Sequence, residues 1–122
     1  MIAESGDPFS LLRILELVAR LPRGRAVRVD EIAAALNATY LDWTFAPAVV
    51  TDALIGLQAN WLSDYRNGSG IVLVEGLQGA TLTIEDSSRV DPWIVRQAAR
   101  AADACRDALL AFSRRGGTGF DD

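Results

Sequence analysis

The sequence lacks residue types on which enzyme chemistry often depends. Among its 122 residues there is no histidine, and Cys105 is the only cysteine. Without histidine, neither a Ser-His-Asp nor a Cys-His catalytic site can be assembled, and a tetrahedral zinc site lacks its usual ligands. The sequence also has no glycine-rich phosphate-binding loop and no dinucleotide-binding motif. We therefore expect no enzyme activity, no metal and no cofactor.

Lysine is absent as well, so all 12 basic residues are arginine. No apolar run approaches the roughly 20 residues that span a membrane, and the first residues show no signal-peptide pattern. A single cysteine excludes an internal disulfide and fits a reducing compartment. These features favour a cytoplasmic protein that does not contact a membrane.

What is present is typical of one globular domain. Half of the residues are hydrophobic and 23% are charged. Residues 8–21 predict a helix, because Asp7 is a suitable N-cap, Pro8 suits the first helical position and apolar residues recur at helical spacing. The Asp-Pro pair at 91–92 has the same form and predicts a second helix start, with the helix running to residue 115.

The segment after the first helix is predicted to contain a short strand, a helix and an apolar connector. Residues 25–29 (RAVRV) predict a short strand, and Asp30 is expected to cap a helix over residues 31–37. The connector at residues 37–46 is too apolar for a solvated loop, so we expect it to add a turn of helix packed on the core. We expect two aromatic residues of this connector, Trp43 and Phe45, to lie in the core rather than to stack on a ligand, and we expect the same of Trp61 further along the chain.

A second long helix is predicted over residues 47–66 by apolar residues spaced four, three and four apart. Gly56 inside it suggests the close approach of another backbone. Two β-rich runs within residues 71–86, around a short turn at residues 77–80, then predict a hairpin.

This order of elements resembles the winged helix-turn-helix superfamily. The segment "RVDEIAAALN" resembles the first helix of the motif, "APAVVTDALIGLQANWL" the second helix and "IVLVEGLQGATLTI" the wing. The resemblance implies a mainly helical α+β fold with a small β-hairpin and a long C-terminal helix. It divides the chain into a winged helix-turn-helix domain (residues 1–90), a helix that often forms a dimer (residues 91–115) and a tail expected to be flexible (residues 116–122).

The superfamily usually places its second helix in the major groove of DNA, but charge is distributed unfavourably for this. Residues 37–91 hold that helix and the wing, and they carry seven carboxylates against two arginines. Residues 1–36 are balanced, and residues 92–115 carry five arginines against two aspartates. Because phosphate contacts require a positive surface, the segment assigned to DNA is the most acidic part of the chain.

Candidate DNA contacts come from two places. Four arginines surround the first strand and either hold phosphates or pair with nearby carboxylates such as Glu16, Asp30 and Glu31; they are Arg20, Arg23, Arg25 and Arg28. On the helix over residues 47–66, only Thr51 and Gln58 are suited to reach base edges.

Candidate protein contacts also come from two places. On the helix over residues 47–66, Ile55 is expected to point outward, with Leu62 seven residues on. The C-terminal helix has an apolar side that either lies on its own domain or pairs with a second copy, and we favour pairing. The members of this side proposed to make contacts are Ala98, Ala101, Cys105 and Phe112.

The sequence therefore supports two functional hypotheses. The first, favoured by the superfamily resemblance, is a homodimeric DNA-binding transcriptional regulator. The alternative is a winged-helix protein–protein interaction module, either an assembly subunit or an adaptor, that does not read DNA.

Overall fold

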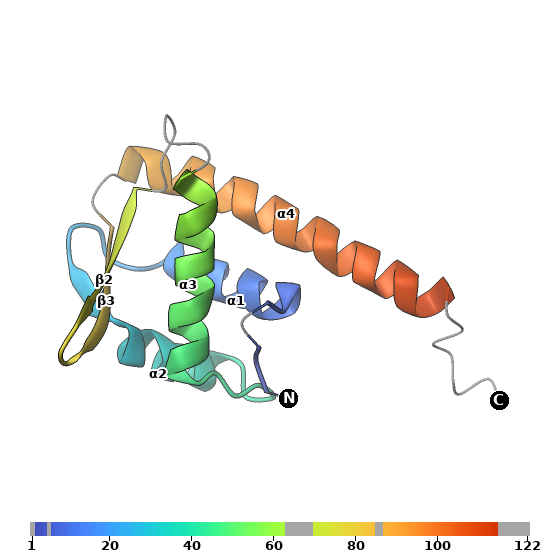
Figure 1. The fold of residues 1–122 in the computed structure, drawn as a ribbon, viewed down its shortest axis with the longest axis horizontal. Coiled ribbons are helices and arrows are strands. Elements are labelled where there is room, and N and C mark those ends of the chain that lie inside the picture. Colours follow the sequence, from blue (N-terminus) through green and yellow to red (C-terminus); the bar gives the residue numbers. More distant parts are fainter. Residues whose placement is uncertain (1, 5, 63–69, 85–86, 115–122) are drawn as a thin grey trace.

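The computed structural model describes residues 2–4, 6–62, 70–84 and 87–114; for residues 58–62 and 87–88 it describes the backbone alone. In these ranges the chain forms helices and a small antiparallel sheet that lies at one edge of the molecule (Figure 1). The elements are α1 (Pro8–Val18), β1 (Ala26–Arg28), α2 (Val29–Thr39), α3 (Pro47–Leu62), β2 (Ile71–Gly76), β3 (Gly79–Ile84) and α4 (Ser87–Arg114). The predicted α+β class with a long C-terminal helix is confirmed.

Helix α1 begins where its sequence predicts. The Asp7 carboxylate accepts hydrogen bonds from the Phe9 backbone N–H at 3.0 Å and from the Ser10 hydroxyl at 2.9 Å, and Pro8 occupies the first turn. These bonds satisfy groups that a helix start otherwise leaves unpaired. The helix ends at Val18, earlier than predicted, because Arg20 and Leu21 donate to carbonyls only three residues back, as in a tighter turn.

Asp30 does not cap α2, and this prediction is wrong. The helix begins at Val29, and the capping residue Arg28 makes no side-chain cap hydrogen bond. The Asp30 carboxylate instead accepts a hydrogen bond from the Arg28 guanidinium at 2.7 Å. Together with Glu31, Asp30 still lies in the first turn, where negative charge is favoured by the helix dipole.

The connector between α2 and α3 is a turn rather than an added turn of helix. Asn37, near the end of α2, pairs with the Phe45 backbone in both directions: Phe45 N–H donates to Asn37 Oδ1 at 2.7 Å, and Asn37 Nδ2 donates to the Phe45 carbonyl at 3.0 Å. The Phe45 side chain is buried in the core and Trp43 is partly buried against it. The N-terminal segment lies alongside, where Ala3 N–H donates to the Thr44 carbonyl at 2.9 Å.

Helix α3 is continuous from Pro47 to Leu62, and its predicted extension to residue 66 lies outside the described residues. Its buried side chains are Val50, Ala53, Leu54 and Leu57. The prediction for Gly56 is wrong: this residue is exposed, and a Cβ built on it would meet no other atom within 4 Å. Within the described ranges, no backbone therefore approaches α3 at this point.

The three strands pair antiparallel in the order β1-β3-β2. Leu82 in the central strand lies opposite both Val27 and Leu73, and its buried side chain joins the core formed with the helices. The tip of the hairpin is Leu77–Gln78, because Gly79 already pairs with Gly76. Gly79 has a φ of 107°, a conformation that other residues rarely adopt.

Helix α4 begins at Ser87, so the predicted start at the Asp91–Pro92 pair is wrong and Pro92 lies inside the helix. Asp91 is exposed and pairs with Arg23, at 2.9 Å, rather than capping the helix. Trp93, at 1% exposed, anchors this part of α4 in the core. The helix then runs alongside α1 in the opposite direction and continues past the start of α1 (Figure 1).

Among the described residues, no helix combines the length and apolarity needed to cross a membrane.

Candidate functional site

The arginines around β1 are mostly engaged by carboxylates. Arg20 contacts Glu16 at 2.9 Å, Arg23 contacts Asp91 at 2.9 Å, and Arg28 contacts Asp30 at 2.7 Å. These contacts agree with the alternative that the arginines pair with carboxylates. The partner of Arg23 was not predicted, because Asp91 lies 68 positions away in the sequence.

Arg28 and Arg25 differ from the other two in their surroundings. Arg28 also donates to the Gln78 carbonyl at 3.3 Å, which ties β1 to the tip of the hairpin. Arg25 is exposed and has no ion pair with the described part of the chain. Of the four arginines, Arg25 is therefore the one most available to an external anion.

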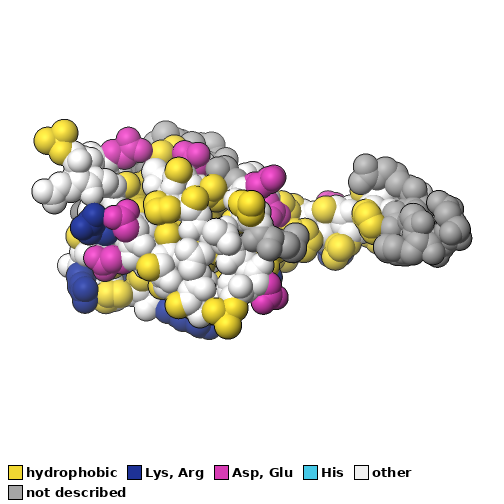
Figure 2. All heavy atoms as spheres, turned by 90° about the horizontal axis from the view of Figure 1, so that it is seen from below, with side chains coloured by type: hydrophobic (Ala, Val, Ile, Leu, Met, Phe, Trp, Pro, Cys, Tyr) yellow, Lys and Arg dark blue, Asp and Glu magenta, His cyan; other side chains and the backbone are white. Residues whose placement is uncertain are grey.

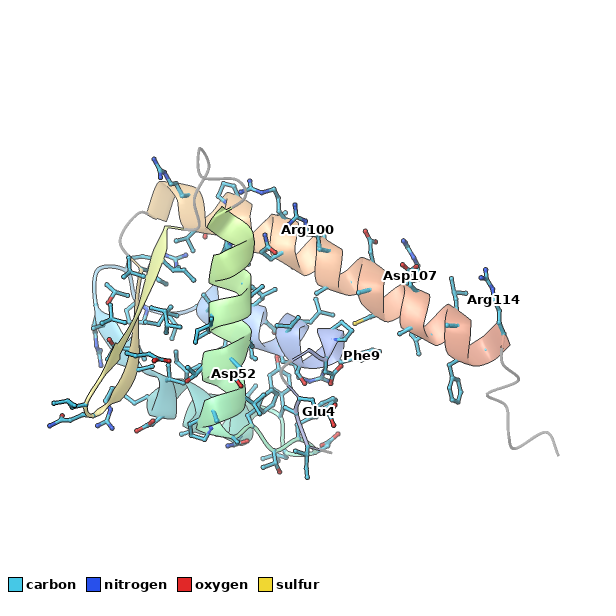
Figure 3. All side chains as sticks on the ribbon, in the orientation of Figure 1. Glu4, Phe9, Asp52, Arg100, Asp107 and Arg114 are labelled. Atoms are coloured by element: carbon cyan, nitrogen blue, oxygen red, sulfur yellow. The ribbon has the colours of Figure 1, made fainter. Side chains whose placement is uncertain are left out.

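The surface formed by α3 and the hairpin contains no basic residue in its sequence; its charged residues are Asp52 and Glu75. Thr51 is partly buried, and Asp52 is exposed on α3 (Figure 3). The side chains of Gln58 and Leu62 lie outside the described residues. On the face drawn in Figure 2, acidic and hydrophobic side chains are interspersed, and the basic side chains that it shows lie toward its edges.

Apolar side chains are exposed on the same surface. Ile55 is 42% exposed on α3, as predicted, and Val74 and Leu77 on the hairpin are 55% and fully exposed. Val74 and Leu77 were not predicted as contact residues, although an apolar residue at a two-residue hairpin tip is an available signal. The described side chains of α3 and the hairpin thus combine exposed apolar groups with carboxylates and include no cation.

The apolar side of α4 has two parts with different surroundings. Ala101 and Cys105 are buried, and Ala98 is partly buried, within the chain's own fold. Burial raises the pKa of the Cys105 thiol, and the charge of Asp7 raises it further. Ala101 and Cys105 are thus already covered, so a second copy would not contact them without displacing α4.

Beyond Cys105, every described residue of α4 is exposed. This segment, residues 106–114, is called the free end of α4; Asp107 and Arg114 mark it in Figure 3. Its large apolar side chains are Leu109, Leu110 and Phe112, which are 59%, 47% and 49% exposed. Phe112 was predicted as a contact residue, whereas the adjacent leucines were missed.

Arg13 lies over the rings of Trp43 and Tyr40, with its guanidinium carbon 4.5 Å and 5.1 Å from the two ring centres. The Tyr40 hydroxyl donates to Glu16 at 2.6 Å, and burial together with this hydrogen bond raises the pKa of Tyr40. The arrangement attaches the connector to α1 through cation–π contacts. The ring of Trp43 is therefore in contact with Arg13 of the chain itself, as expected for an aromatic residue that packs in the fold rather than stacking on a ligand.

A pocket of about 210 Å³ lies between the start of α1, α3 and α4. Most of its lining is apolar, but Gln97 and Arg100 contribute polar groups from α4. The described lining residues are Gly6, Pro8, Leu11, Leu15, Leu57, Gln97, Arg100, Ala101 and Ala104. This pocket was not predicted from the sequence, where its one signal is Gln97, a polar residue at helical spacing within the apolar side of α4.

The described residues contain no cluster of three or more histidine, cysteine or acidic side chains that could hold a metal. No protein-family model, curated protein or solved structure matches this chain.

Proposed function

We propose that this chain is a protein-interaction module built on a winged helix-turn-helix framework, and that the free end of α4 pairs with a second copy. The framework is supported by the order α1-β1-α2-α3-β2-β3 and by the sheet order β1-β3-β2, which together put a hairpin directly after the second helix of the motif.

The charge distribution supports a protein partner over DNA. Non-specific affinity for DNA comes mainly from cations that neutralise phosphates. The α3 and hairpin sequences supply none, and three of the four arginines around β1 already contact carboxylates. Exposed Ile55, Val74 and Leu77 instead offer apolar contact area on that side of the molecule.

The free end of α4 carries the proposal. Ala108, Leu109 and Phe112 continue, at helical spacing, the side of α4 on which Ala101 and Cys105 are buried. The partner element α1 begins at Pro8, so this side continues beyond the element that covers it (Figure 1). Two copies related by a two-fold axis would cover both free ends with the same residues.

The expected dimer is reversible. Fully burying a leucine or phenylalanine contributes about 1.5–3 kcal/mol, so Leu109 and Phe112 from two copies contribute at most about 6–12 kcal/mol. Association costs roughly 4–15 kcal/mol in lost translational and rotational freedom. The two ranges overlap, which predicts association in the micromolar range or weaker rather than a permanent dimer.

Sedimentation equilibrium over a concentration series tests this proposal. We expect the wild-type chain to associate to a dimer and the double variant Leu109→Asp with Phe112→Asp to remain a monomer with an unchanged circular dichroism spectrum. The matched control is Val95→Asp: Val95 is also an exposed apolar residue of α4, at 67% exposure, but lies outside the free end. A monomeric wild type, or a double variant that dimerises normally, would overturn the proposal.

DNA binding is the second candidate, and one observation favours it. Arg25 is exposed without an ion-pair partner in the described part of the chain, and the neighbouring pairs of Arg20 and Arg28 are more than half exposed. Exposed ion pairs are weak, so these arginines could exchange a carboxylate for a phosphate.

A further inference from the structure

We infer that the pocket between α1, α3 and α4 binds a small monocarboxylate with a compact apolar body. The pocket is separate from the free end of α4, because its α4 lining stops at Ala104. Leu11 and Leu15 from α1 and Leu57 from α3 form apolar walls. Such walls fit a hydrocarbon group and give little orientation to it, so orientation must come from the polar lining.

Gln97 provides the first polar group and the strongest indication of a ligand. Gln97 is only 7% exposed, and its side chain makes no hydrogen bond to the described part of the chain. The buried side-chain nitrogens and oxygens without a partner in the described part of the chain do not include the Gln97 amide, so this amide keeps accessible surface at the pocket. A ligand atom in the pocket would supply the missing partner.

Arg100 provides the second polar group and determines the charge of the ligand. It lies three residues after Gln97 on α4, it is exposed, and it contributes to the pocket lining. It forms no ion pair with the described residues, and the described lining contains no carboxylate to compete for it. A guanidinium binds a carboxylate through two parallel hydrogen bonds, so a ligand carboxylate can contact Arg100 while its apolar body lies against the leucines.

The volume limits the size of the ligand. The pocket has a volume of about 210 Å³. Pockets for drug-sized ligands are larger, at about 300–1,000 Å³. A single aromatic ring or a short alkyl chain with one carboxylate is therefore the class that fits.

Benzoate and benzyl alcohol form a matched pair of probes, because they differ mainly in charge. Titration of the full chain, followed by amide chemical shifts in NMR, should show saturable benzoate binding centred on residues of α1 and α4. Arg100→Gln should weaken benzoate binding at least about tenfold, the loss of a charge-assisted hydrogen bond, and leave the weak binding of benzyl alcohol unchanged. Arg114→Gln removes the same charge from the same helix outside the pocket and should have no effect.

Ala104→Leu is a second variant, since it fills the mouth of the pocket from an exposed position without removing a polar group. We expect it to abolish binding of both probes in a folded chain. The inference is overturned if benzoate does not saturate the shifts, if Arg100→Gln and Arg114→Gln bind it equally, or if benzyl alcohol binds as tightly as benzoate. These outcomes do not depend on whether the chain dimerises.

Discussion

At the scale of single residues, Asn37 has the clearest structural role. It occupies the last turn of α2 and pairs with both the N–H and the carbonyl of Phe45, as a neighbouring strand would. The bonds fix the path of the connector, so that the Phe45 side chain enters the core and α3 can begin two residues later. An asparagine at a helix end ordinarily suggests only a helix stop, and the sequence did not reveal this function.

Replacing Asn37 with alanine is expected to destabilise the fold by about 1–3 kcal/mol, because two hydrogen bonds are lost and the part-buried N–H and carbonyl of Phe45 lose their partner. Urea unfolding followed by circular dichroism measures this change. Thr39→Ala is the control, since the Thr39 hydroxyl donates only to the Ala35 carbonyl of its own helix and is exposed. Equal midpoints for the two variants would contradict the proposed role of Asn37.

Tyr40 makes the stability of the fold depend on pH in the alkaline range. Burial, and then the hydrogen bond to Glu16, raise its pKa above the usual value of 10.0. Folding therefore favours the neutral phenol. The resulting stabilisation is complete below pH 10.0 and is lost as pH rises through the pKa of the folded chain.

The variant Tyr40→Phe tests this sign. Wild type should be more stable than the variant at neutral pH, by about 0.5–1.5 kcal/mol for one hydrogen bond, and the difference should shrink as pH is raised through the tyrosine range. Urea unfolding at a series of pH values provides the measurement. The raised pKa of Cys105 acts in the same direction in both proteins and cancels in the comparison. A difference that stays constant with pH would exclude this role of Tyr40.

At the scale of elements, two glycines have opposite roles. Gly79 follows the hairpin tip with a φ of 107°, where a side chain is strained. Gly56 lies within α3, where a Cβ would meet nothing within 4 Å, so this glycine only adds conformational freedom to the unfolded chain.

We therefore expect Gly79→Ala to destabilise the chain by about 1–3 kcal/mol and Gly56→Ala to stabilise it by about 0.5–1 kcal/mol. Thermal and urea unfolding of the two variants in parallel checks both signs, and each variant serves as the control for the other. The assignment of the hairpin turn would be wrong if Gly79→Ala left stability unchanged.

The elements also show which parts of the fold are readable from sequence. The start of α1 is predicted correctly because Asp7 and Pro8 act within one turn. The same pair at Asp91 and Pro92 does not start a helix, since α4 already begins at Ser87 and contains the proline. A local motif predicts a local hydrogen bond, and it fails where long-range packing decides the outcome.

The candidate surfaces also combine features that local sequence predicts with features that depend on long-range contacts. Outward exposure of Ile55 follows from helical periodicity alone. The contact of Arg23 with Asp91 joins residues 68 positions apart, and the division of α4 into a covered part and a free end depends on where α1 starts. Neither feature is encoded within a single window of the sequence.

At the scale of the whole molecule, charge determines which partners are compatible. The chain has a net charge of −4 and a pI of about 4.7, and its paired arginines further reduce the field around β1. Long-range attraction to a polyanion is therefore weak.

The chain is expected to show no measurable binding to mixed-sequence duplex DNA even at low salt. Fluorescence anisotropy of labelled DNA, repeated over a salt series, tests this expectation. Steep weakening with salt, together with a loss of affinity in the variant Arg25→Ala with Arg28→Ala, would instead establish the DNA-binding function.

The position of Cys105 has a practical consequence. The only thiol of the chain lies at the last covered turn of α4, where it is 6% exposed. A thiol-specific reagent can reach it only during excursions in which α4 lifts away from α1, so the labelling rate reports how often this junction opens. The native sequence thus carries its own kinetic probe at the boundary between the domain and its projecting helix.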